Sequence, residues 1–186
     1  RDVSFVVEKK EAKPGEVVLD IKDMTVASKR HKNNAVNGVS LQVHRGEIVC
    51  IAGIDGNGQT EFVYGLSGLE PLKSGTITMN GKDITHMPIR ERLTSGMSHI
   101  PEDRHKHGLV LDYSLEDNIV LQRYFEPQFT NKLGFLKRKE IRKYANRLIE
   151  QYDIRSGQGA VTKARSMSGG NQQKAIIARE IDKNPE

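Results

Sequence analysis

The sequence predicts an α/β fold, with a mixed sheet core, an antiparallel β-subdomain and an inserted helical subdomain. One observation is the apolar run at 47–52, which is followed by a glycine-rich turn and a helical repeat, the order of a buried strand, a loop and a helix. The other is the change after residue 101, where charged loops and helical periodicity replace strand patterns. We therefore expect a linker or tail at 1–16, a core at 17–101 and a helical subdomain at 102–186.

Short strand and turn patterns follow one another through the expected core. Strands are predicted at 17–21, 24–26, 36–43, 47–52 and 97–100, with a polar loop at 28–34 and a short helix at 88–94. A longer helix has apolar residues at Phe62, Val63, Leu66 and Leu69, and Gly68 is placed to end it. Asn80-Gly81 predicts the tight turn of a hairpin between 76–79 and 82–85.

The expected helical subdomain has its own start signals and faces. The segment from Ser114 to Asp117 is a capping-box pattern that begins one helix. A longer helix presents one apolar face, made of Ile141, Tyr144, Ala145, Leu148 and Tyr152. Basic residues occupy its other faces, and we interpret them as a solvated surface: Lys137, Arg138, Lys139, Arg142 and Lys143.

The composition is typical of a globular protein. Of 186 residues 36% are hydrophobic and 28% charged, and no apolar run reaches the length of a membrane span. The single cysteine, Cys50, cannot form an internal disulfide, and its place in the apolar run predicts a buried thiol in a reducing compartment. The net charge of +5 suits a polyanionic ligand, a nucleic acid or an anionic membrane surface equally well.

The glycine-rich turn has the composition of a phosphate-binding loop. Gly53, Gly56 and Gly58 leave backbone amides accessible and permit positive φ, and the following helix N-terminus favours anions. Set against the pattern GxxxxGK[ST], Thr60 is in register as a candidate Mg²⁺ ligand. Gln59 stands at the lysine position, so the loop lacks the cation that reaches the β- and γ-phosphates. Alone, such a loop is equally well a strand-to-helix turn without a ligand.

A second anion-binding pattern lies at 166–174, with the sequence SMSGGNQQK. Ser168 can cap the helix that follows, and the two glycines after it expose backbone amides. Apolar residues recur along that helix at Ile176, Ile177, Ala178 and Ile181. The chain therefore has two candidate anion sites, and their presence together requires an explanation.

The string MSGGNQQK resembles the signature motif of ATP-binding cassette (ABC) ATPases, and its NQQK ending is similar to the variant of bacterial simple-sugar and nucleoside importers. GEIVCIAG, the phosphate loop, SGTITMNGKDIT, HIPEDR and GLVLDYSLEDNI agree with the family in order, so the resemblance covers about Val17 to Glu186. It implies an ABC cassette of P-loop NTPase type, an ATPase with ATP and Mg²⁺ as cofactors.

The resemblance also implies the site residues. The ATP-binding residues would be Gly53, Asp55, Gly56, Asn57, Gly58, Gln59, Thr60 and Glu61, with Ser168, Gly169, Gly170 and Asn171 of the signature serving a companion cassette. Glu102 stands where the family has a glutamine that touches Mg²⁺ and the attacking water, so Thr60 and Glu102 are the expected metal ligands. Glu102, Ser168 and Gly169 are the expected catalytic residues. Only Arg30 and His31 lie near the place of the adenine-stacking aromatic.

The segment Glu102-Asp103-Arg104 resembles the second of two fused cassettes in sugar and nucleoside importers. That likeness implies a fused companion cassette, transmembrane permease subunits, an extracellular solute-binding protein acting indirectly, and a place at the cytoplasmic face of the membrane. No nucleic acid is expected. Because the sequence ends before the family's Walker B strand, we interpret it as a truncated cassette that is inactive alone.

Two alternative functions and one alternative site stay open at this point. A soluble ABC ATPase acting on nucleic acid would use the basic surface, and a regulatory nucleotide-binding module without turnover would account for the missing lysine. His105 and His107 resemble half of a metal site, but Cys or Asp ligands at usable spacing are missing around them. We interpret both histidines as loop residues.

Overall fold

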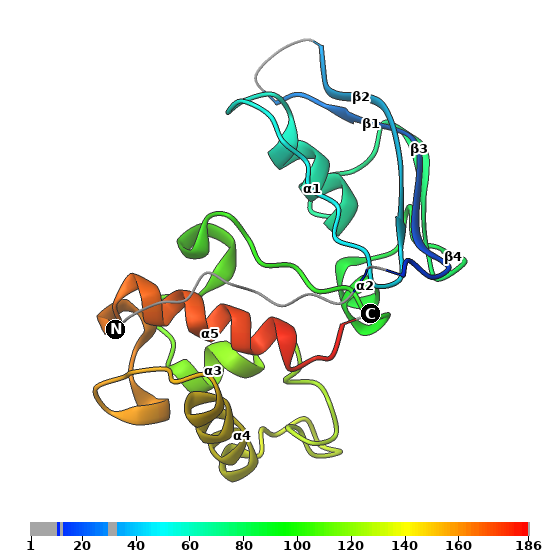
Figure 1. The fold of residues 1–186 in the computed structure, drawn as a ribbon. Coiled ribbons are helices and arrows are strands. Elements are labelled where there is room, and N and C mark those ends of the chain that lie inside the picture. The colour runs from blue at the N-terminus through cyan, green and yellow to red at the C-terminus, as the bar shows by residue number, and fades with distance from the viewer. Residues whose placement is uncertain (1–10, 12, 30–32, 186) are drawn as a thin grey trace. The chain divides into compact units, whose positions relative to one another are not determined.

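The computed structural model describes residues 11, 13–29 and 33–185, and it divides the chain into two compact units, one ending at Arg92 and the other beginning at Leu93 (Figure 1). Each unit is described here by itself. Most of the predicted tail, together with Arg30 and His31, lies outside the described residues. No helix among the described residues is long and apolar enough to cross a membrane.

The first unit is built on an antiparallel sheet with the strand order β2-β1-β3-β4 (Figure 1). Its strands are β1 (Val17–Ala27), β2 (Asn34–His44), β3 (Ser74–Met79) and β4 (Lys82–Asp83). Asn80 and Gly81 both have positive φ, 51° and 75°, which confirms the predicted hairpin turn. The predicted strand patterns at 17–26, 36–43 and 76–79 are therefore confirmed.

Helix α1 (Gln59–Ser67) packs on the sheet through its smallest residue. A Cβ on Gly65 would lie 2.9 Å from a methyl carbon of Val26 and closer still to Met24, so the backbone of the helix lies directly against side chains of β1 here. Gly68 ends the helix in the left-handed conformation, as predicted. The short helix α2 (Ile89–Thr94) is also confirmed.

Two predicted strands are wrong. Residues 47–52 form no regular element, and Ile48 is 94% exposed and Ile51 52%. Cys50, predicted to be buried, is exposed as well. A strand that is apolar on both faces needs parallel neighbours and covering helices, whereas the described sheet is wholly antiparallel and none of its strands pairs with this run.

The other failed prediction is the strand at 97–100, whose residues also form no regular element. This segment is fixed by the C-terminal end of a helix instead of by a neighbouring strand. The Ser98 hydroxyl donates to the Glu180 carbonyl at 2.8 Å, and the His99 amide donates to the buried Glu180 carboxylate at 3.3 Å. These hydrogen bonds to the end of a helix satisfy the polar groups of Ser98 and His99, so the segment needs no neighbouring strand.

The second unit, which begins at Leu93, is helical. Its elements are η1 (Arg104–Gly108), α3 (Leu115–Val120), α4 (Arg138–Gln151), η2 (Gly159–Val161), η3 (Ala164–Ser166) and α5 (Gly169–Ile181). Helix α3 packs against both α4 and α5 (Figure 1). The predicted apolar face of α4 is buried at Ile141, Tyr144, Ala145 and Leu148. The Ser114 hydroxyl accepts from the Asp117 amide at 3.2 Å, which confirms the predicted cap of α3.

Candidate functional site

The phosphate loop, residues 53–60, is a tight turn that leads directly into α1. Gly56 and Gly58 have positive φ, 85° and 96°, and Gly58 is the N-cap of the helix. The Phe62 amide makes the first bond of the helical ladder, to the Gly58 carbonyl at 2.8 Å. This bond starts the helix at a glycine-rich turn, and a helix N-terminus of this kind is an arrangement that binds anions.

Close backbone approach explains one glycine of this loop. A Cβ on Gly58 would collide with the backbone carbonyl of Ala35 in β2, so this position requires glycine both for its φ and for space. The loop thus lies directly on the sheet of its own unit.

The side chain of Gln59 folds back over the phosphate loop. Its Nε2 atom donates to the Ile54 carbonyl at 3.2 Å and fills the space that a Cβ on Gly53 would occupy. The sequence predicts only that Gln59 lacks the positive charge of a lysine, and it gives no sign of this hydrogen bond to Ile54. From 53 to 61 the loop has two acids, Asp55 and Glu61, and no basic residue, so an anion here would depend on backbone amides and a metal ion.

The signature residues, 168–171, form the N-terminus of α5. Ser168 is the N-cap, with φ −65° and ψ 152°, and Gly169 and Gly170 are the first helical residues. The predicted position of the cap is confirmed, but a capping bond from the Ser168 side chain is not made. Its hydroxyl instead accepts from the Asn171 side-chain amide at 2.9 Å. The Asn171 carbonyl oxygen accepts from the Arg155 amide at 2.8 Å, so Asn171 fixes the serine to the preceding loop.

Sequence reasoning missed a group of residues that supports this helix start. The Arg104 guanidinium lies against Gly169, where a Cβ would be 2.9 Å from Nη2. Arg104 Nε donates to Oε1 of Gln172 at 3.3 Å, and His105 Nε2 lies 2.9 Å from the same oxygen. Gln172 is buried and donates to the Ala164 carbonyl at 2.9 Å. Spacing along the chain gives no signal for these contacts, because the partners are 67 and 68 residues apart.

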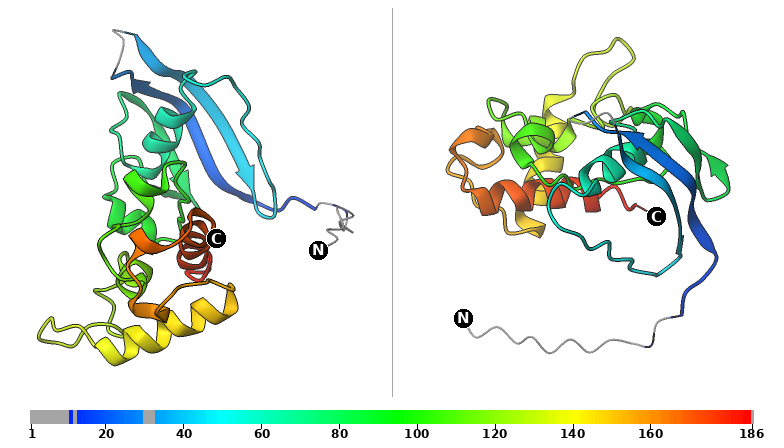
Figure 2. Two further views of the ribbon diagram at one scale, coloured as in Figure 1. Left: turned by 90° about the vertical axis from the view of Figure 1, so that its left-hand side faces the viewer. Right: turned by 90° about the horizontal axis from the view of Figure 1, so that it is seen from above.

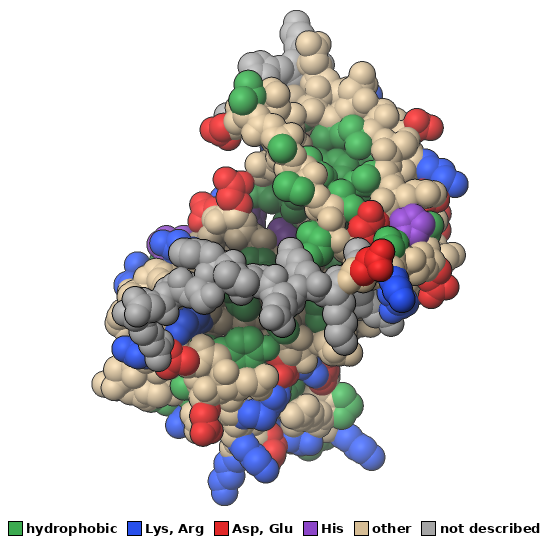
Figure 3. All heavy atoms as spheres, viewed as in Figure 1, with side chains coloured by type: hydrophobic (Ala, Val, Ile, Leu, Met, Phe, Trp, Pro, Cys, Tyr) green, Lys and Arg blue, Asp and Glu red, His purple; other side chains and the backbone are tan. Residues whose placement is uncertain are grey.

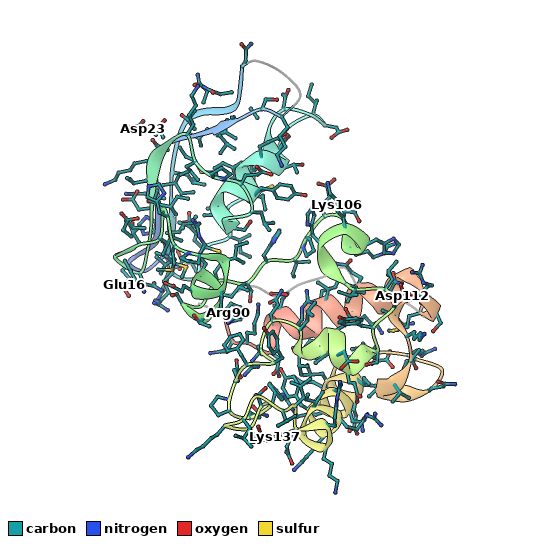
Figure 4. All side chains as sticks on the ribbon, turned by 180° about the vertical axis from the view of Figure 1, so that it is seen from behind. Glu16, Asp23, Arg90, Lys106, Asp112 and Lys137 are labelled. Carbon is teal, nitrogen blue, oxygen red and sulfur yellow. The ribbon has the colours of Figure 1, made fainter. Side chains whose placement is uncertain are left out.

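The helix η1 that supplies Arg104 and His105 is capped by Asp103. The carboxylate of Asp103 accepts from the Lys106 amide at 3.0 Å and the His105 amide at 2.9 Å, and these bonds lower the pKa of Asp103. Figure 4 shows Lys106 on this helix, next to the ribbon that leads toward Asp112. The prediction that His105 and His107 are loop residues is wrong, because both lie within η1.

Two predicted groups of site residues therefore assemble, each within its own unit. The residues from Gly53 to Glu61 lie together at the start of α1, and those from Ser168 to Asn171 lie together at the start of α5. Glu102 is exposed and belongs to the second unit, so its pairing with Thr60 around Mg²⁺ stays a prediction.

Comparison with known families and proteins gives one consistent answer. Residues 36–186 match the model of the family described as ABC transporter. The chain is 50% identical over all 186 residues to the nucleoside import ATP-binding protein NupA of Lactococcus lactis subsp. cremoris and to the guanosine import ATP-binding protein NupO of Bacillus subtilis. It spans 36% of the length of each of these two relatives.

Solved structures resemble the fold. A nucleotide-free ATP-binding cassette matches with a TM-score of 0.69 at 17% identity, over 91% of this chain and 66% of that one. A dimeric cassette in a post-hydrolysis state with ADP and Pi matches with a TM-score of 0.68 at 22% identity, over 90% of this chain and 70% of that one. At these identities the likeness supports the ABC cassette fold.

Proposed function

This chain belongs to the ABC transporter family, and from that premise we propose that it is the second nucleotide-binding domain of an ATPase that energises solute import. The observation that carries the proposal is the pair of glycine-rich helix starts, one at α1 and one at α5. In an importer with two cassettes, these two helix starts would contact two different ATP molecules. The phosphate loop would hold ATP directly, and the signature would complete the ATP site of the companion cassette.

At the signature we assign the catalytic contacts to Ser168, Gly169 and Gly170. Their hydroxyl and amides would meet the γ-phosphate of an ATP held by the companion cassette and would stabilise the charge that develops as water attacks and ADP leaves. The Ser168 hydroxyl is already held by Asn171, so its orientation is fixed before nucleotide arrives. This arrangement supports a signature that is ready for catalysis.

At the phosphate loop we assign a weaker nucleotide site. The amides of α1 fit a phosphate group, and Thr60 and Glu102 would hold Mg²⁺, which neutralises charge on the β- and γ-oxygens. Gln59 is neutral and already donates to Ile54, and Asp55 and Glu61 add negative charge. A charge-assisted hydrogen bond is worth about 1.5–3 kcal/mol, so the missing lysine would weaken ATP binding roughly tenfold to a hundredfold. A domain of this kind is regulatory at its own site and catalytic at its companion's.

The proposed solute is a nucleoside. The two relatives at 50% identity are named for nucleoside and guanosine import, whereas the relatives named for glucose and ribose import are 37% and 34% identical. The proposed partners are a companion cassette in the same polypeptide, transmembrane permease subunits and, indirectly, an extracellular solute-binding protein. The complex would place this chain at the cytoplasmic face of the membrane.

The test is a comparison of two substitutions in the whole importer, with ATPase activity and nucleoside uptake as readouts. Removing one preorganised donor from such a site costs about 10²–10³ in rate, so Ser168→Ala should nearly abolish both activities. Gln59→Ala, the matched change in the weaker site, should reduce them less than tenfold. Equal losses in the two variants would contradict the asymmetric assignment. Full activity of Ser168→Ala would contradict the assignment of the signature.

A further inference from the structure

The loop between α3 and α4 holds a fixed backbone at its tip. The side-chain oxygen of Asn131 accepts from the amides of Leu133 and Phe135, each at 2.9 Å. The Asn131 amide donates to the Phe135 carbonyl and the Gly134 amide to the Asn131 carbonyl, both at 3.0 Å. A bridge between Thr130 and Leu136 closes the turn. One asparagine therefore sets the conformation of residues 131–136.

This fixed tip presents two large apolar side chains to solvent. Leu133 is 82% exposed and Phe135 is 69% exposed. Both views in Figure 2 show the loop projecting away from the helices of its unit, beyond the N-terminus of α4. A structured loop that holds two nearby apolar side chains out of the core offers a contact site to an apolar partner.

The surroundings of the tip are strongly basic. From 132 to 147 the sequence has seven Lys or Arg residues and a single acid, Glu140. Arg138 and Arg142 are paired with Asp117 and Glu116. Lys132, Lys139 and Lys143 make no ion pair or hydrogen bond with any part of the chain that the structure describes. Figure 3 shows the Lys and Arg side chains that gather around α4.

Lys139 and Lys143 line a shallow groove on α4, together with Arg138, Arg142 and Asn146. We propose that the surface formed by residues 131–143, which we call the loop–α4 surface, docks on an anionic membrane. Leu133 and Phe135 would enter the boundary between headgroups and acyl chains, and Lys132, Lys139 and Lys143 would lie over acidic headgroups. An exposed aliphatic side chain at the tip favours lipid over nucleic acid, because leucine enters an acyl region without a cost but must unstack neighbouring bases to find apolar surface in a nucleic acid.

The experiment is sedimentation of the 186-residue chain with phosphatidylglycerol–phosphatidylcholine vesicles at low salt. Because a basic residue near an anionic surface changes binding about fivefold, the triple variant of Lys132, Lys139 and Lys143 to Ala should bind about a hundredfold more weakly. Leu133→Ser with Phe135→Ser should weaken binding by roughly tenfold or more.

The matched control replaces Lys22, Lys73 and Lys82, three exposed lysines of the first unit, by Ala, and removes the same charge. It should bind within about twofold of the wild type, since these lysines lie off the proposed surface.

Several results would overturn the proposal. Equal losses in the two lysine triples would mean that net charge alone attracts the chain. Unchanged vesicle binding by the variant with Leu133→Ser and Phe135→Ser would exclude insertion of the tip. Binding to RNA or DNA that depends on Lys132, Lys139 and Lys143, without binding to vesicles, would assign the surface to nucleic acid. The changed side chains are exposed, so unaltered thermal unfolding monitored by circular dichroism checks that each variant folds. None of these outcomes depends on ATP, so they leave the proposed function untouched.

Discussion

Arg104 and Gln172 are joined by a hydrogen bond from Nε of the guanidinium to Oε1 of the buried side-chain amide, at 3.3 Å. The bond ties the segment after Pro101 to the first turn of α5. The same guanidinium lies against Gly169, so the signature residues have support from outside their own helix. A cation beside a helix N-terminus is unfavourable for the helix dipole, and a bound phosphate would reverse that effect.

We predict that Arg104 and Gln172 are coupled energetically. In a double-mutant cycle with Arg104→Ala and Gln172→Leu, the interaction free energy of unfolding should be about 0.5–1.5 kcal/mol, the net value of one intramolecular hydrogen bond. Urea unfolding of the four proteins measures it. The control is the cycle for Arg165 and Asp112, an ion pair with side chains 61% and 71% exposed, which should show a weaker coupling because solvent screens it. A coupling near zero for Arg104 and Gln172 would contradict their role as a support.

We predict unequal effects of alanine at two neighbouring glycines of the phosphate loop. Gly56 and Gly58 both have positive φ, so alanine at either should cost about 1–2 kcal/mol in backbone strain. Gly58→Ala also drives a Cβ into the Ala35 carbonyl and should lose a further 1–3 kcal/mol or so, because a backbone atom cannot rotate away. A Cβ on Gly56 meets nothing within 4 Å.

Chemical unfolding of the two variants measures that difference, and titration with Mg-ATP tests its consequence for the loop. We expect Gly56→Ala to retain weak nucleotide binding and Gly58→Ala to lose it. Equal stabilities would show that β2 moves away at little cost, and the close approach of loop and sheet would then be unimportant for the site.

Local signals account for the parts of the fold that the sequence predicts. The cap at Ser114, the Asn80-Gly81 turn and the end of α1 at Gly68 each depend on residues within one turn, and all three are confirmed. The buried strand at 47–52 depended on neighbouring strands that local pattern cannot specify. Without them its apolar side chains are exposed.

In the candidate site, too, local sequence predicts the backbone features, whereas tertiary packing decides the side-chain contacts. Glycine spacing predicts the positive φ at Gly56 and Gly58, because only the backbone of the loop is involved. The side chains are less predictable. Ser168 gives up its expected capping bond because Asn171 competes for its hydroxyl, and Arg104 reaches Gln172 across 68 residues of sequence. Such choices depend on tertiary packing.

The last prediction concerns pH and His99, a half-buried residue whose backbone amide donates to Glu180. Burial lowers the pKa of His99, and the nearby Glu180 carboxylate only partly opposes this effect. In the unfolded chain a histidine has a pKa of about 6.5. Between that value and the lowered pKa of the folded state, the unfolded chain binds more protons. The contribution of neutral His99 to the free energy of unfolding is therefore complete above about pH 6.5. It is lost as the pH falls through the folded-state pKa.

We expect the urea midpoint of the wild type to fall between pH 7.5 and pH 5.5, and that of His99→Gln to fall less, because glutamine does not titrate. His86→Gln, a change at an exposed histidine of the first unit, is the matched control and should follow the wild type. A His99→Gln variant with the full wild-type pH dependence would show that other groups set the acid sensitivity. A variant that loses more stability at pH 5.5 than the wild type would mean that protonated His99 is stabilised by Glu180, and the sign of the burial effect would then be wrong.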